Sequence, residues 1–176
     1  MSEKGENKPA KSHGDVEKEE LDKRAQNAIE EARMVLPGIQ ALFGFQLVAI
    51  FNQRFPQIPV QQQMLHYAAL LLIAIAIGLI MAPAAYHRIV EQHSVSRFFI
   101  QLASFMIAIS MLPLLTAISF EIYILGHLVL DNDQASFWIA SAVAAFLATL
   151  WYVFPFAARM MVQRAAQRRA MKAVQQ

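Results

Sequence analysis

Four long apolar stretches constrain the fold of this chain more than any other feature. They cover residues 37–55, 67–86, 98–130 and 135–158. Each is long enough to cross a bilayer, because a helix rises about 1.5 Å per residue and about 20 residues span the hydrocarbon core. The stretches are continuous rather than alternating, which is typical of helices and not of the strands of a membrane barrel. The sequence therefore predicts an all-α, polytopic membrane protein with a four-helix transmembrane bundle.

The segments around these stretches divide the chain into four parts. Residues 1–14 are polar and lack an apolar pattern, so we expect a disordered tail. Residues 15–36 repeat apolar side chains every three to five positions, which predicts an amphipathic juxtamembrane helix, although a solvated charged helix fits the same pattern. Pro37 is expected to bend the chain and to begin the bundle, residues 37–158. Residues 159–176 form a basic tail that should bind anionic lipid.

Lysine and arginine are distributed very unevenly over the predicted loops. Fourteen of the 15 lie in the N-terminal segment, the middle loop or the C-terminal tail, and one, Arg54, lies on the opposite side. Basic loops remain on the cytoplasmic side of a membrane. We therefore expect a multi-pass protein with both termini in the cytoplasm.

Composition and motifs exclude several function classes. The chain is 57% hydrophobic and has no cysteine, so disulfides, thiolate metal sites and cysteine nucleophiles are excluded. It has no phosphate-binding glycine loop and no HExxH or GxSxG motif. The basic tail lacks interleaved aromatic residues, so lipid is expected as its partner and nucleic acid is not. We expect neither an enzyme nor a bound cofactor.

Glu121 is the one acidic residue inside a predicted span. Ionisable groups at membrane depth are costly and usually functional. Glu121 lies near the outer interface when residues are counted from the start of the long third span, and near the midplane when they are counted back from its end. A deep carboxyl group could carry a proton, whereas a shallow one would be an ordinary interfacial carboxylate. His127 is a second candidate for proton or ion handling, but it lies about 240° further around the helix, so the two would pair only if the helix were distorted.

Two glutamines, Gln40 and Gln46, lie within the first span. Glutamine in lipid usually forms a hydrogen bond to a neighbouring helix. The functional alternative is a polar line through the bundle, completed by Gln101, Ser104, Thr116 and Ser119. On that alternative, both glutamines join Glu121 as candidates for ion or proton handling.

Charged and titratable residues gather where the first span begins and the second ends. They are Glu31, Arg33, His87 and Arg88. An antiparallel hairpin places these ends together, so we expect Glu31 to contact Arg88, Arg33 or both. The functional alternative is a site for a small anion or a lipid headgroup. We expect no metal site, because the histidines lack the helical spacing of metal ligands.

Small residues recur at intervals of four on two of the spans. They are Ala74, Gly78 and Ala82 on the second span, and Ala140, Ala144 and Ala148 on the fourth. Such faces allow helix backbones to approach closely in lipid. We expect them to make contacts within the bundle. Contact with a second copy or with another membrane protein is the alternative.

The first hairpin also carries a set of short sequence pieces that resemble a known family. The pieces are Glu31-Ala32-Arg33, Gly38-Ile39-Gln40, Leu42-Phe43-Gly44-Phe45-Gln46, Phe51, Arg54-Phe55, Tyr67 and Ala82-Pro83-Ala84-Ala85-Tyr86-His87-Arg88. Together they resemble a family of uncharacterised small bacterial four-helix inner-membrane proteins, some of which carry the label sodium:proton antiporter. The resemblance covers about a third of the chain. It implies a bacterial inner-membrane location and four spans, and it brings no site residues.

Two functions therefore remain open. The first is a small proton or cation transporter, or a channel-like protein, that uses Glu121 and the polar line and could act as an oligomer. The second is a non-catalytic scaffold or accessory subunit that packs against other membrane proteins through its small-residue faces.

Overall fold

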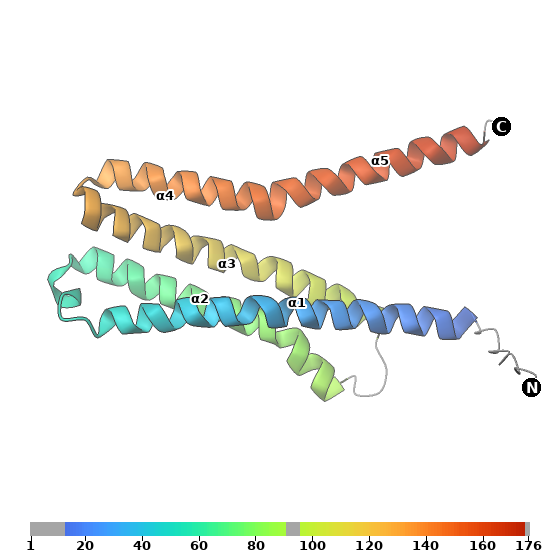
Figure 1. The fold of residues 1–176 in the computed structure, drawn as a ribbon, viewed down its shortest axis with the longest axis horizontal. Helices are drawn as coiled ribbons and strands as arrows, with labels where there is room; N and C mark the ends of the chain where they lie inside the picture. Colours follow the sequence, from blue (N-terminus) through green and yellow to red (C-terminus); the bar gives the residue numbers. More distant parts are fainter. Residues whose placement is uncertain (1–12, 91–95, 175–176) are drawn as a thin grey trace, which may run out of the picture.

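The computed structural model describes residues 13–90 and 96–174, and these residues are almost entirely helical (Figure 1). The main helices are α1 (His13–Ile50), α2 (Val60–Val90), α3 (Arg97–Leu130), α4 (Asp133–Ala148) and α5 (Phe154–Val174). A short 3₁₀ turn, Phe55–Gln57, lies between α1 and α2, and a π-helical turn, Thr149–Val153, joins α4 to α5. The predicted all-α class is confirmed.

Four helical segments are long and apolar enough to cross a membrane. They are Glu19–Ile50, Val60–Val90, Arg97–Leu130 and Asp133–Arg168. Many large apolar side chains on them are exposed, including Phe45, Phe105 and Phe146. A water-soluble monomer rarely exposes apolar surface on this scale, whereas a lipid-facing helix requires it. The structure thus agrees with the predicted number of spans.

The first span differs from the prediction at both of its ends. Helix α1 continues through Pro37 without a break, so the predicted juxtamembrane helix and first span form one helix of 38 residues. Proline removes only one backbone donor, and a long helix tolerates that loss. The helix ends at Ile50 rather than at residue 55. The predicted disordered tail lies almost wholly outside the described residues.

The turn 51–59 between α1 and α2 and the turn 131–132 between α3 and α4 lie at the same end of the molecule, which we call the hairpin end (Figure 1). Helix α1 begins at the opposite end, which we call the terminal end. The α2–α3 hairpin is at the centre, with α1 packed across both of its helices and α4 packed mainly against α3. The bundle is therefore more open than the compact arrangement expected from the sequence.

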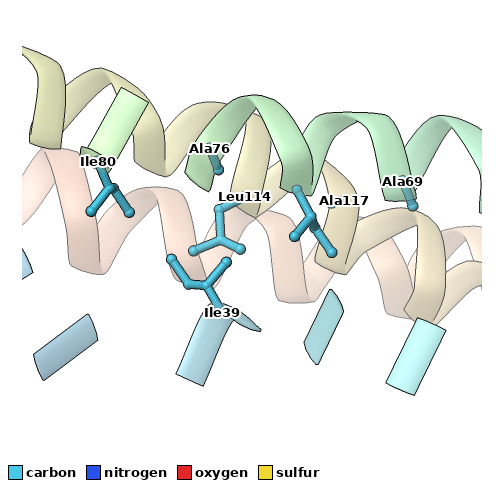
Figure 2. Packing of buried hydrophobic residues seen from close by; sticks show 7 residues of the cluster. Ile39, Ala69, Ala76, Ile80, Leu114 and Ala117 are labelled. Carbon is cyan, nitrogen blue, oxygen red and sulfur yellow. The ribbon is translucent and has the colours of Figure 1, made fainter. Parts of the chain in front are cut away.

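The apolar core lies where α1, α2 and α3 meet. Ile39 from α1 points toward Leu114 of α3, near Ala76 of α2 (Figure 2), and Ile73 of α2 belongs to the same buried cluster. Alanines and isoleucines alternate along this face of α2, so its backbone approaches α3 closely. The core therefore fills the bundle between the hairpin end and the terminal end.

Helix α5 diverges from the bundle after the π-helical turn (Figure 1). Pro155 follows this turn and cannot donate a backbone hydrogen bond, which favours the irregular winding before it. Within the turn, Trp151 packs against the core and the Tyr152 hydroxyl donates to the carbonyl oxygen of Ala108 at 2.9 Å. The predicted basic tail is thus helical as far as Val174.

Small residues have different roles on the two predicted faces. Ala140 of α4 is buried, as expected for a contact within the bundle. On α2, however, Ala74 and Gly78 are exposed, and nothing lies within 4 Å of a Cβ added at Gly78. The α2 face therefore points away from the bundle, and the prediction of an internal contact there is wrong. Lipid and protein neighbours are both apolar, so a small-residue pattern alone does not distinguish them.

The close approach of α3 and α4 depends on Gly126. A Cβ added there would lie 3.1 Å from the Cβ of Ser136 and 3.3 Å from its Cα. Ser136 is fully buried, and its hydroxyl donates to the carbonyl oxygen of Asn132 at 2.7 Å, so it has little freedom to move.

Gly126→Ala is therefore expected to destabilise the protein relative to Gly78→Ala by about 1–2 kcal/mol. Both substitutions gain the same helix propensity, so the difference isolates the steric effect. Unfolding in detergent micelles, followed by circular dichroism, measures it. Equal stabilities of the two variants would show that α4 shifts without cost.

Candidate functional site

His66 connects three helices near the hairpin end. Its Nδ1 lies 2.9 Å from Oε1 of Glu121 on α3, and its Nε2 lies 3.0 Å from the backbone carbonyl oxygen of Gln46 on α1. The imidazole is 5% exposed, and the Phe55 ring meets it edge-on at 5.4 Å between centroids. A titratable pair is therefore held between the helices and shielded on one side by an aromatic ring.

The hydrogen-bond partner of Nε2 determines the chemistry of this pair. A carbonyl oxygen only accepts hydrogen bonds, so Nε2 carries a hydrogen and donates it. In neutral histidine Nδ1 is then an acceptor, so its 2.9 Å approach to the carboxylate oxygen Oε1 is favourable only when one of the two groups carries an additional proton. The pair can hold this proton as imidazolium and carboxylate, or as imidazole and carboxylic acid. Both forms have a net charge of zero.

A cavity of about 460 Å³ leads to the pair from the hairpin end. Its polar and charged lining residues are Asn52, Arg54, His66 and Glu121, and the remaining lining residues are Ala49, Phe55, Ile58, Ile124, Leu125 and Leu128. The Glu121 side chain is 27% exposed, whereas His66 lies buried behind it. A molecule in the cavity can therefore reach the carboxyl group before it reaches the imidazole.

Two buried glutamines lie on the helices beside the pair. Gln46 supplies the carbonyl that His66 binds, and Gln62 precedes His66 by one helical turn on the buried face of α2. Both polar atoms of the Gln46 side chain and the Oε1 atom of Gln62 lack a hydrogen-bond partner among the described residues. Buried polar groups are normally satisfied, so these amides mark the region as polar and able to bind water or a polar ligand.

His127 does not join Glu121. Its Nδ1 lies 2.6 Å from Oδ1 of Asp133, the first residue of α4, and the hydroxyl of Tyr123 donates to the same oxygen at 3.2 Å. Helix α3 is undistorted between the two positions, so Glu121 and His127 stay on different faces, as their spacing indicated. Asp131 ends α3 in the left-handed conformation at φ 49°, and the Asn132 side chain caps α4.

The predicted polar line is not formed. Gln40, Gln101 and Ser104 are exposed on the outer surface of the helices. Thr116 and Ser119 donate to carbonyl oxygens of their own helix, at 3.0 and 2.8 Å. Of the two predicted glutamines, only Gln46 lies beside the candidate site.

The inner-face residues also do not form the expected contacts. Glu31 and Arg33 are exposed, and in the described part of the chain Glu31 has no ion pair with Arg33 or Arg88. His87 instead packs against the ring of Phe99, with centroids 5.2 Å apart. Glu31 lies within the long helix α1, and its side chain is on an exposed face of that helix.

Comparison with known proteins identifies the family. The model of DUF6328, a family of unknown function, matches residues 14–155. The chain belongs to this family. No curated protein and no solved structure matches it. The DUF6328 region runs from α1 to the start of α5 and so contains Gln46, His66 and Glu121.

His66 is the member of this DUF6328 site that sequence reasoning missed. It immediately precedes the predicted second apolar stretch, residues 67–86, although α2 already begins at Val60. A usable signal was present, because antiparallel helices pair residues at equal distances from their connection. His66 is as far along the chain from Val90, the last residue of α2, as Glu121 is from Arg97, the first residue of α3.

Proposed function

We propose that this chain is a small proton or cation transporter of the bacterial inner membrane that binds its proton between His66 and Glu121. The observation that supports the proposal is the 2.9 Å contact between two titratable side chains inside apolar helices. Such groups are rare in membrane spans and are typical of proton pathways. Among the residues that the structure describes, no serine, threonine, cysteine or lysine lines the cavity beside the pair, so the site lacks the usual side-chain nucleophiles, which favours transport over covalent catalysis.

The pair has the chemistry that a proton carrier needs. It holds one proton in its neutral form, and loss of that proton leaves one negative charge in a medium where isolated charge is costly. Another cation arriving at the carboxyl group would restore neutrality. The hydrogen bond from Nε2 to Gln46 persists in every one of these states, so the imidazole keeps its position during exchange.

The position of the site also suits transport. Glu121 lies about 14 Å and His66 about 9 Å from the hairpin ends of their helices, counted at 1.5 Å per residue. The cavity is lined by residues near the hairpin end, including Asn52, Arg54 and Phe55 of the connection between α1 and α2. Toward the terminal end, the core residues Ile73 and Leu114 close the path. Transport would then require a rearrangement of this core, as in carriers that expose a central site to each side in turn.

The distribution of basic residues sets the proposed orientation. The hairpin end would face outward, and the termini, with the basic residues of α5 on anionic lipid, would face the cytoplasm. Protons would therefore reach Glu121 from outside through the cavity.

Proton flux in proteoliposomes tests the proposal. Wild-type protein with an internal pH-sensitive dye should dissipate a pH gradient faster than protein-free liposomes do. Glu121→Gln keeps the size of the side chain and removes its titration, so its flux should fall to the protein-free level. Glu31→Gln is the matched control, because Glu31 is exposed and lies far from the pair. Equal flux for Glu121→Gln and wild type would contradict the proposal.

An accessory role is the second candidate, and one observation favours it. The exposed Ala74 and Gly78 of α2 leave room for the backbone of another helix. A wild-type protein without flux that co-purifies with a membrane protein, and loses that protein on Gly78→Leu, would favour this role over transport.

A further inference from the structure

The cavity over Glu121 has walls that suit an organic ligand. Six of its ten lining residues are apolar, and one of them is Phe55, whose aromatic ring contacts His66, the partner of Glu121. Its volume of about 460 Å³ lies within the range of small-molecule sites, which are mostly apolar with a few polar groups. Asn52 and Glu121 are the lining residues whose side chains supply oxygen atoms. Hard metal ions require more oxygen ligands than these two side chains provide.

From this geometry we infer that the cavity binds an organic monovalent ammonium ion, which exchanges for the proton held between His66 and Glu121. The inference rests on the proposed function and names a substrate class for the same site. A carboxylate provides the counter-charge, and a phenyl ring beside it attracts a quaternary or alkylated ammonium group through its π face. The apolar walls would contact the remainder of the ligand.

The balance of charge explains why the two ions compete. The neutral pair contains one proton, one imidazole and one carboxylate. When the ammonium ion binds to the carboxylate, the proton leaves for the solvent, and the site again holds a single positive charge against Glu121. Simultaneous binding would leave an uncompensated charge beside an apolar core, which is strongly unfavourable. One ammonium ion should therefore displace one proton.

The other charged groups near the cavity do not alter this balance. Arg54 lies in the exposed connection between α1 and α2, where water and salt screen its charge. His127 and Asp133 pair with each other on a different face of α3. The part of α1 that contributes to the site does so through the carbonyl of Gln46 and through Ala49, neither of which titrates.

Isothermal titration of the full-length protein in detergent tests the inference, with benzyltrimethylammonium as the probe. The probe should bind and release one proton per molecule, measured from the dependence of the heat on the ionisation enthalpy of the buffer. Its affinity should fall as the pH is lowered, because protons compete for the same site. Benzenesulfonate, an anion of similar size, should not bind.

Two variants assign the binding to the cavity. Glu121→Gln should lower the affinity for the probe at least tenfold and abolish proton release. Phe55→Leu keeps an apolar wall and should lower the affinity about three- to tenfold, because it removes the cation–π attraction, while proton release per bound molecule stays at one. Phe51→Leu is the matched control, since Phe51 is exposed and does not line the cavity.

The outcomes separate this inference from the proposed function. Probe binding without proton release, or binding to Glu121→Gln at wild-type affinity, would overturn the inference. If proteoliposomes conduct protons in the absence of the probe while the probe fails to bind, the transport proposal stands and the ammonium ion is excluded. If the probe displaces a proton but a gradient of the probe drives no proton flux across proteoliposomes, the exchange site stands and proton transport fails.

Discussion

Replacing His66 by phenylalanine is expected to lower the free energy of unfolding by about 3 kcal/mol. The phenyl ring fits the space of the imidazole but has no nitrogen atoms. The carbonyl of Gln46 then loses its 3.0 Å contact, and the Glu121 carboxyl group loses its 2.9 Å contact with Nδ1. Neutral hydrogen bonds between membrane helices average only about 0.6 kcal/mol. Most of the expected loss therefore comes from leaving the carboxyl group unpaired.

Titration with SDS from mild detergent micelles, followed by circular dichroism, measures this loss. Tyr67→Phe is the matched control, because Tyr67 is the next residue, is 54% exposed and should tolerate the change. Adding Glu121→Gln to His66→Phe should recover part of the stability, since no ionisable group is then left without a partner. If His66→Phe is as stable as Tyr67→Phe, the pair does not hold the three helices together.

The number of helices was predictable because the length and continuity of apolar stretches respond directly to the thickness of a bilayer. The four predicted stretches correspond to the four long helical segments of the structure. Boundaries were less predictable where they depended on one residue. Pro37 was expected to interrupt the chain, yet it lies inside α1, because the helix loses a single backbone hydrogen bond there and keeps the rest.

The orientation of each helix about its own axis was much harder to predict. In a water-soluble bundle, polarity distinguishes the buried face from the exposed one, but in lipid both faces are apolar. For this reason the small-residue pattern of Ala74 and Gly78 did not reveal that this face is exposed, whereas the core runs along Ala69, Ile73 and Ala76. Polarity was the better guide at Gln46 and Glu121, whereas Gln40, Gln101 and Ser104 are exposed.

Glu121 was recognised because charge inside a span needs a partner. Its partner was sought on the same helix, at His127, and was found on the neighbouring helix at the same distance from the connection. Ile73 and Leu114, which share the core, obey the same relation, because they also lie equally far from the α2–α3 connection. The partner of a charged residue should therefore be sought first on the neighbouring helix, at the same distance from the connection, and only then on the same helix.

Phe99→Ala is expected to lower the free energy of unfolding by about 2–3 kcal/mol, whereas Phe98→Ala should change it by less than about 0.5 kcal/mol. Phe99 is fully buried, and Phe98 beside it is 60% exposed. The Phe99 ring stacks on Tyr86 of α2 at 6.1 Å and contacts the cluster formed with Ala25 of α1 and Ala103 of α3. It therefore joins three helices at the terminal end.

In soluble proteins, replacing a buried phenylalanine by alanine typically costs roughly 3–5 kcal/mol. The expected loss is smaller here, because moving apolar atoms from lipid into the protein gains little free energy, so the cost of the cavity is most of what remains. The two variants delete the same atoms from adjacent positions, so the difference between them isolates packing from hydrophobicity. Unfolding by SDS measures both. Equal losses would mean that α1 is not anchored on the α2–α3 hairpin at this end, and that the core around Ile39 and the His66 contact provide the link between α1 and the hairpin.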